Sequence, residues 1–170
     1  MVAGYPNIRG QYPAAFVSAL EAADLCKAQG KRLCSEEEWT FACEGEEAMP
    51  YSHAAGYERD PSACITDVAW DAPNERALED RTSRAAAHEM DRLWRGKASG
   101  TQRCKSAFGV HDMVGNVDEW TTASPGVEGS QTILKGGYWG PVRARCRPST
   151  RSHDARHEYF QQGFRCCASR

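Results

Sequence analysis

The sequence contains no apolar run long enough to cross a bilayer, so we expect no transmembrane segment. Its N-terminal residues lack a charged region followed by an apolar stretch, so we expect no signal peptide within this chain. Neither sign of charge dominates, because 21 Lys and Arg stand against 23 Asp and Glu and the net charge is −2. This balance gives no electrostatic basis for binding nucleic acid or an anionic membrane.

What is present is the composition of an ordinary globular domain. The chain has 170 residues, of which 41% are hydrophobic and 26% are charged. Such a length is typical of one domain and suffices to bury a sizeable core. No internal repeat interrupts it, so we expect a single domain over residues 1–170.

Cysteine is the most informative residue type. The chain has eight cysteines, an even number, and no C-x-x-C spacing that would indicate a zinc site. They are Cys26, Cys34, Cys43, Cys64, Cys104, Cys146, Cys166 and Cys167. Disulfides formed in an oxidising compartment explain this content better than eight free thiols. We therefore expect an extracytoplasmic protein that is secreted, periplasmic or surface-anchored, although spacing alone leaves the pairing open.

Two helices are predicted in the first third of the chain. Residues 17–29 place apolar side chains on one side of a helix. The second helix begins after Ser35, which forms an S-x-x-E capping box with Glu38, and ends at Gly45. A third helix is expected over 83–95, within a highly charged segment that is typical of a solvated excursion.

Short runs of strand-forming residues follow, separated by Gly- and Pro-rich turns. They cover residues 117–121, 132–134, 143–147 and 164–168. Helices followed by short strands of this kind predict an α+β domain with much irregular structure.

Five segments with specific sequences occur in a fixed order. They are residues 30–33 running into 35–39, residues 108–120 with the motif GNVDEW, residues 134–139 with the motif GGYW, residues 147–151, and residues 163–165 with the motif GFR. This combination resembles the formylglycine-generating enzyme family, also called the sulfatase-modifying factor family. The resemblance runs from about residue 12 to residue 168 and implies an elaborated C-type-lectin-like fold. The family's N-terminal portion is not recognisable, so we expect a domain that lacks it.

Active members of this family are copper oxidases. Two cysteines beyond the GG segment bind Cu(I), and dioxygen then converts a substrate cysteine into an aldehyde. The matching positions here are Pro141 and Cys146, and Tyr138 replaces the serine that follows GG. Proline has no ligand atom, and one thiolate does not supply the two-sulfur site that suits Cu(I). The resemblance therefore implies a chain without copper, in which Cys146 is either a lone thiol activated by neighbouring arginines or a disulfide cysteine.

Two functions from different classes follow from these observations. The first is a disulfide-stapled binding or structural module for peptide or protein ligands, which lacks the copper oxidase chemistry. The alternative is a divergent oxidoreductase, of formylglycine-generating or non-haem iron type, completed by another domain or chain. His153 and His157 lie four residues apart and are either metal ligands or part of a solvated loop. The missing cysteine pair favours the binding module.

The family binds an extended peptide in a groove. In this chain, Tyr138, Trp139 and Arg151 are the residues expected to line such a groove by stacking and hydrogen bonding. The alternative for Trp139 is packing in the core.

The resemblance also implies disulfide pairs. In the family, the cysteine of the first helix bridges to the cysteine after GFR, and the cysteine late in the second helix bridges to the strand region before residue 147. The matching pairs are Cys26–Cys166 and Cys43–Cys146. By elimination, the remaining pairs are Cys64–Cys104 and Cys34–Cys167.

One structural calcium ion is also implied. In the family it is bound by a side chain three residues before the GN glycine, by two backbone carbonyls and by the following glutamate. These positions are Asp112, Gly115, Val117 and Glu119, and oxygen is the ligand that calcium prefers. The alternative is a tight turn whose carboxylates cap backbone amides. The segment that forms the family's other calcium site is absent before residue 109, so one site is expected.

Overall fold

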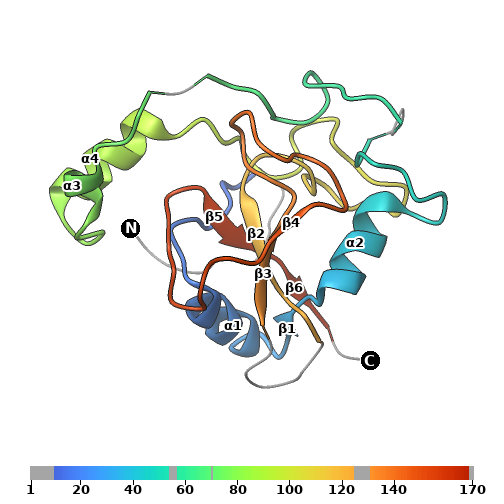
Figure 1. The fold of residues 1–170 in the computed structure, drawn as a ribbon, viewed down its shortest axis with the longest axis horizontal. Coiled ribbons are helices and arrows are strands. Elements are labelled where there is room, and N and C mark those ends of the chain that lie inside the picture. The colour runs from blue at the N-terminus through green and yellow to red at the C-terminus, as the bar shows by residue number, and fades with distance from the viewer. Residues whose placement is uncertain (1–9, 54–56, 70, 125–130, 169–170) are drawn as a thin grey trace.

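The computed structural model describes residues 10–53, 57–69, 71–124 and 131–168. Its elements, labelled in Figure 1, are α1 (Ala19–Lys27), β1 (Arg32–Leu33), α2 (Glu36–Glu44), α3 (Glu75–Leu78), α4 (Arg84–Leu93), β2 (Asp118–Thr122), β3 (Thr132–Lys135), β4 (Ser149–Thr150), β5 (Gln162–Phe164) and β6 (Cys166–Cys167). Much of the chain between them is irregular, as expected for this α+β domain. No helix in these ranges is long and apolar enough to cross a membrane.

A four-stranded sheet lies at the centre of the molecule, with α1 and α2 on either side of it (Figure 1). Its strand order is β4-β3-β2-β5, in which β2 runs antiparallel to β3 and parallel to β5. Trp120 on β2 is opposite Leu134 on one neighbour and Phe164 on the other. A second, two-stranded sheet pairs β1 with β6, so the last strand of the fold lies beside the first.

Helix α1 begins with a capping box that the sequence analysis overlooked. The Ser18 side chain accepts the Glu21 backbone amide, and the Glu21 carboxylate accepts the Ser18 amide. Beyond the cap, the buried face of α1 carries Ala19, Ala22 and Cys26, which pack against Trp120 and Leu134 of the sheet. The helix therefore spans nine residues and is shorter than the predicted 17–29.

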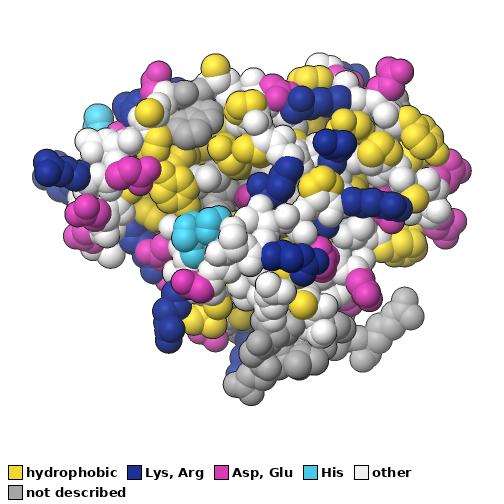
Figure 2. Space-filling model, viewed as in Figure 1, with side chains coloured by type: hydrophobic (Ala, Val, Ile, Leu, Met, Phe, Trp, Pro, Cys, Tyr) yellow, Lys and Arg dark blue, Asp and Glu magenta, His cyan; other side chains and the backbone are white. Residues whose placement is uncertain are grey.

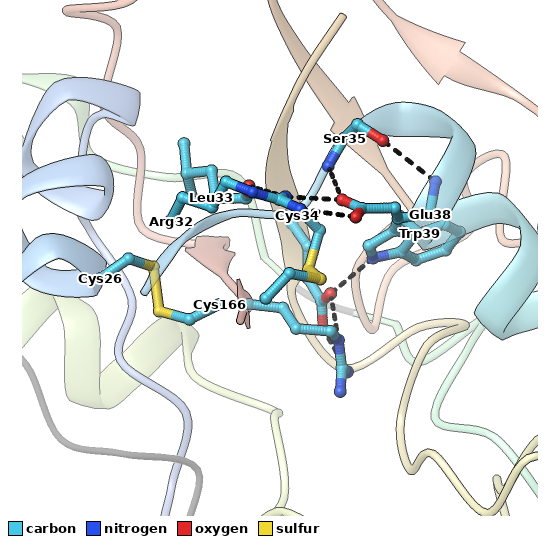
Figure 3. The surroundings of a disulfide bond; sticks show 11 residues. Cys26, Arg32, Leu33, Cys34, Ser35, Glu38, Trp39 and Cys166 are labelled. Atoms are coloured by element: carbon cyan, nitrogen blue, oxygen red, sulfur yellow. Dashed lines mark hydrogen bonds and ion pairs between the residues drawn. A yellow bond between two sulfur atoms is a disulfide. The ribbon is translucent and has the colours of Figure 1, made fainter. Parts of the chain in front are cut away.

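Helix α2 has the capping box that was predicted at Ser35 and Glu38. The Glu38 carboxylate also binds the Arg32 guanidinium through two hydrogen bonds of 2.7 Å, and Figure 3 shows these contacts around the helix N-terminus. Trp39 and Cys43 lie four residues apart on the buried face. The cap thus fixes the start of the helix that carries Trp39 into the core.

The charged segment that was expected to be solvated contributes to the core instead. Helix α4 has the expected position, and its Leu93 side chain is fully buried in a cluster with Trp139 and Phe160. Polar side chains cover the outer face of the helix, which is why the segment has the composition of a surface excursion.

Two of the predicted strands differ from the structure. Residues 143–147 are irregular, and the strand that pairs with β3 is β4, where Thr150 is opposite Leu134. The run at 164–168 is divided between β5 and β6, which belong to different sheets. Both differences depend on pairing partners that are distant in sequence. The sequence of a short strand carries little information about its partner.

Four disulfides link segments that are distant in sequence. The pairs are Cys26–Cys166, Cys34–Cys167, Cys43–Cys146 and Cys64–Cys104. These are the pairings that the resemblance and elimination led us to expect. The first two both attach β6 to the region of α1 and β1.

Candidate functional site

Glu119 on β2 accepts hydrogen bonds from two directions in the core. The indole Nε1 of Trp39, on α2, donates to its Oε2 at 2.7 Å. The Arg165 guanidinium donates to both carboxylate oxygens, at 2.9 Å from Nε and 2.8 Å from Nη2. Figure 3 shows Trp39 turned toward this carboxylate. Because the Glu119 side chain is only 5% exposed, its charge requires such partners.

A cavity of about 200 Å³ lies beside this ion pair. It is lined by Pro13, Ser99, Gly100, His111, Asp112, Asn116, Val117, Glu119, Phe164 and Arg165. We call it the carboxylate cavity, since the buried side chains of Asp112 and Glu119 both line it. Three of the four residues predicted to bind calcium are therefore brought together, and Gly115 lies in the same turn without lining the cavity.

Asp112 is the less neutralised of the two carboxylates. Its Oδ2 accepts the Gly100 backbone amide at 2.6 Å, which is the amide capping that the alternative interpretation expected. Burial raises the pKa of Asp112, and the nearby charge of Glu119 contributes in the same direction. A cation in the cavity would relieve both effects.

Gly115 is required by close packing as well as by its conformation. Its φ is +77°, and a Cβ at this position would lie 2.1 Å from the carbonyl oxygen of Ile65. Both observations exclude a larger residue. The glycine of GNVDEW therefore has a structural reason that does not depend on a bound ion.

The donor set fits calcium in chemical type. Asp112 and Glu119 supply carboxylate oxygens, and the turn supplies the carbonyls of Gly115 and Val117. Two carboxylates outnumber the one guanidinium of Arg165, so negative charge remains for a cation. Within the described ranges, no group of three or more His, Cys, Asp or Glu could hold a metal. An ion here would depend on carbonyl oxygens and water to complete its coordination.

Cys146 is not a free thiol. It is fully buried and bonded to Cys43, which rejects the lone reactive thiol and leaves the disulfide interpretation. All eight cysteines lie within the described ranges, and none is free. No thiolate is therefore available near residue 141 in this structure.

Of the three residues predicted to form a groove, Tyr138 and Trp139 pack against each other, whereas Arg151 pairs with a different element. Trp139 is fully buried in the core cluster beside α4, so its assignment to a groove was wrong. The Tyr138 ring packs against it, with centroids 5.7 Å apart, and is half-buried. Arg151 forms an ion pair with Glu36 of α2. Apolar neighbours from α4 explain the burial of Trp139, and these could not be assigned from its local sequence.

His153 and His157 lie face to face rather than converging on one point. Their ring centroids are 3.9 Å apart and the rings are nearly parallel. His157 Nδ1 is 3.1 Å from the amide oxygen of Gln162. Burial, followed by the neighbouring His157 and Arg143, lowers the pKa of His153. This arrangement is a stacked pair in an irregular segment and gives no support to metal binding.

A second buried ion pair, which was not predicted from the sequence, lies close to the first. Asp118 precedes Glu119 on β2 and binds the Arg143 guanidinium. Burial raises the pKa of Asp118 to about 6, against the opposing effect of Arg143. The two adjacent acidic residues of GNVDEW could have indicated this second ion pair. Adjacent residues of a strand point to opposite faces, so each buried carboxylate needs its own partner.

Several known proteins are similar to this chain in sequence and in fold. The sequence model of the sulfatase-modifying factor enzyme 1-like domain matches residues 5–170. An inactive C-alpha-formylglycine-generating enzyme 2 of Bos taurus is 26% identical over 181 residues, which cover 93% of this chain and 50% of that protein. A formylglycine-generating enzyme of Mycobacterium tuberculosis is 30% identical over 124 residues, or 71% of this chain and 34% of that protein.

Two solved structures have a similar fold, although their sequences have diverged further. CarF superposes with a TM-score of 0.65 at 16% identity, over 92% of this chain and 67% of that chain. PvdO from Pseudomonas aeruginosa gives a TM-score of 0.61 at 20% identity, over 91% of this chain and 60% of that chain. The chain spans about half the length of the bovine relative. With the family model matched over nearly its whole length, the chain belongs to the sulfatase-modifying factor enzyme 1-like domain family.

Proposed function

We propose that this domain is a binding module of the formylglycine-generating enzyme type that has no copper oxidase chemistry. The observation that carries the proposal is the state of the two positions matched to the copper ligands. One is Pro141, and the other, Cys146, is held in a buried disulfide with Cys43. A two-thiolate Cu(I) site needs both sulfurs free.

The names of its relatives are consistent with this proposal. The bovine protein and its counterpart from Mus musculus, which is 25% identical over 184 residues, are both described as inactive. The M. tuberculosis relative bears the name of the active enzyme, so family membership alone does not decide activity. The ligand positions of this chain are therefore the stronger argument.

A peptide or protein with carboxylate groups is the ligand class we propose. Figure 2 shows a band of Lys and Arg side chains across the middle of one face of the molecule. In the same view, Figure 1 shows that the segment after β3 crosses this face. Arg151 in this segment is partly neutralised by Glu36, whereas Arg145 is exposed and forms no ion pair with a described residue. Tyr138 lies half-buried in the same segment and offers an aromatic edge.

We also propose that a structural calcium ion binds at the carboxylate cavity through Asp112, Gly115, Val117 and Glu119. Its support is the pair of buried carboxylates that line one cavity. The four disulfides further favour an oxidising, extracytoplasmic compartment. Such compartments are also where weak calcium sites are filled.

Fluorescence anisotropy with two labelled peptides of equal length, one rich in glutamate and one rich in lysine, tests the ligand class. We expect the acidic peptide to bind, and Arg145→Glu and Tyr138→Ala each to weaken it. Lys27→Glu on α1 makes the same charge change elsewhere and is the matched control. Equal binding of both peptides, or equal weakening by the control, would overturn the proposed surface.

A further inference from the structure

A second cavity lies next to the carboxylate cavity, and Phe164 and Arg165 line both. Its volume is about 320 Å³. Its lining also includes Lys31, Cys34, Glu38, Trp39, Cys166 and Cys167. We call it the disulfide cavity, because it contains both halves of one disulfide.

Cys34–Cys167 is the disulfide of the four whose two cysteines both line this cavity. Both of its cysteines line the cavity, whereas Cys26–Cys166 contributes only Cys166. The other two disulfides line neither cavity, and all four of their cysteines are buried. Figure 3 shows the Cys34 bridge between the Cys26–Cys166 bridge and Trp39. A small molecule in the cavity would therefore meet both cysteines of this disulfide but only one cysteine of Cys26–Cys166.

The fold can tolerate the opening of this disulfide. β6 pairs with β1, and Cys26–Cys166 already attaches β6 to the end of α1. Cys34–Cys167 crosses the same two-stranded sheet one residue further along. Breaking it would leave the strand pair closed by the neighbouring bridge. The neighbouring bridge therefore holds β6 in place while Cys34–Cys167 reacts reversibly.

The charge around the cavity favours an anionic ligand. Glu38 is neutralised by Arg32, and Arg165 by Glu119. Lys31 is exposed, lines the cavity and forms no ion pair with a described residue. Its ammonium group therefore gives the cavity a positive charge that would attract carboxylates and a thiolate.

We propose that Cys34–Cys167 is a thiol–disulfide exchange site for small anionic thiols. The ligand thiolate attacks Sγ of Cys167, which is half-buried, while Cys34 is buried. A new S–S bond forms between the ligand and Cys167, the Cys34–Cys167 bond breaks, and its electron pair leaves on Sγ of Cys34, which takes a proton from water. The number of disulfides is unchanged, so no oxidant is consumed. The reverse attack by Cys34 releases the ligand.

Native protein incubated with reduced glutathione tests this site. Samples are alkylated with N-ethylmaleimide over time and mapped by peptide mass spectrometry. We expect a glutathione adduct on Cys167 and alkylation of Cys34 at least about tenfold faster than any opening of the other three disulfides, because access controls the rate of exchange. Opening of Cys26–Cys166 at an equal or faster rate, or simultaneous opening of all four, would overturn the proposal.

Two controls separate specific exchange from general reduction. Lys31→Glu is expected to slow exchange with glutathione, which carries two carboxylates besides its thiolate, more than exchange with 2-mercaptoethanol, whose only charge is the thiolate. Lys31→Arg is expected to retain the rate. The Cys34→Ser, Cys167→Ser double variant, with its fold checked by circular dichroism, is expected to acquire no glutathione under the same conditions. Adducts on its remaining cysteines, or an equal effect of Lys31→Glu on both thiols, would contradict the assigned site.

Discussion

Arg165 and Glu119 form a buried ion pair that joins two of the most specific motifs of the sequence. The pair has two hydrogen bonds, of 2.9 and 2.8 Å, between the guanidinium of GFR and the carboxylate of GNVDEW. Because β2 and β5 are adjacent and parallel, Glu119 lies opposite Gly163, two residues before Arg165. The two motifs are therefore joined by one ion pair, and its Arg165 lines both the carboxylate cavity and the disulfide cavity.

Replacing Arg165 by Met leaves the Glu119 charge buried without its cation. We expect a loss of about 3–5 kcal/mol in the free energy of unfolding, measured by urea denaturation. Arg32→Met is the matched control, since Arg32 forms the same two-bond pair with Glu38 near the surface. The control is expected to cost about 1 kcal/mol or less. Equal losses in the two variants would contradict the role given to burial.

The stability losses from removing the two disulfides on β6 are expected to be non-additive. With one of them intact, the other closes a ring of only about ten residues, so removing either pair by Cys→Ser costs about 3 kcal/mol. Removing both also opens the larger ring that Cys26–Cys166 closes together with the intact Cys43–Cys146. This ring has about 40 residues, so the combined cost rises to about 7 kcal/mol. Urea unfolding of the three variants measures this. A quadruple variant whose loss equals the sum of the other two would be inconsistent with shared closure.

Glu38 is expected to contribute stability that is lost in acid. The hydrogen bonds from Arg32, together with the Ser35 amide, lower the pKa of Glu38 from 4.5 to about 2. A pKa lower in the folded state than in the unfolded state means that the contribution is complete above pH 4.5 and disappears as the pH falls toward 2. Its side chain is 38% exposed, so solvent screening limits the effect to about 1 kcal/mol.

Glu38→Gln tests this contribution, because glutamine can still cap the helix but carries no charge. Stability is measured by urea unfolding at several pH values between 2 and 6. The difference between wild type and variant is expected to shrink as the pH falls below 4.5. A difference that stays constant across this range would show that the charge is not responsible.

Calcium is expected to raise the melting temperature of the chain, since a ligand that binds only the folded state stabilises it. Melting curves recorded with EDTA and with added CaCl₂ measure the shift. Asp112→Asn keeps an oxygen ligand but removes the charge, so a smaller shift is expected for this variant. Identical melting temperatures in EDTA and calcium, with no metal found by elemental analysis, would contradict the site.

Local signals in the sequence predicted the parts of the fold that depend on local physics. The capping box at Ser35 and Glu38 predicted the start of α2, and the same pattern at Ser18 and Glu21 would have corrected the start of α1. Strands of two residues, such as β1 and β6, have no measurable periodicity. Their positions are decided by pairing across the whole chain, and residues 143–147 were assigned wrongly for this reason.

The candidate site was predictable to a similar extent. The turn around Gly115 and the carboxylates of Asp112 and Glu119 were identified from one contiguous motif. Arg165 was present in the GFR motif, but its role as the counter-ion of Glu119 depends on the parallel pairing of β2 with β5. Trp139 was expected at a groove and is buried, because α4, from a segment that was expected to be a solvated excursion, packs against it.

An aldehyde assay tests the central claim, that this domain lacks copper oxidase chemistry, most directly. The native protein is incubated with Cu(I), air and a cysteine-containing sulfatase peptide, and the conversion of cysteine to formylglycine is followed by mass spectrometry. The M. tuberculosis formylglycine-generating enzyme serves as the positive control. Our account predicts no conversion above the rate without enzyme, because Pro141 offers no ligand and Cys146 is bonded to Cys43. Catalytic turnover of the peptide by this chain would contradict it.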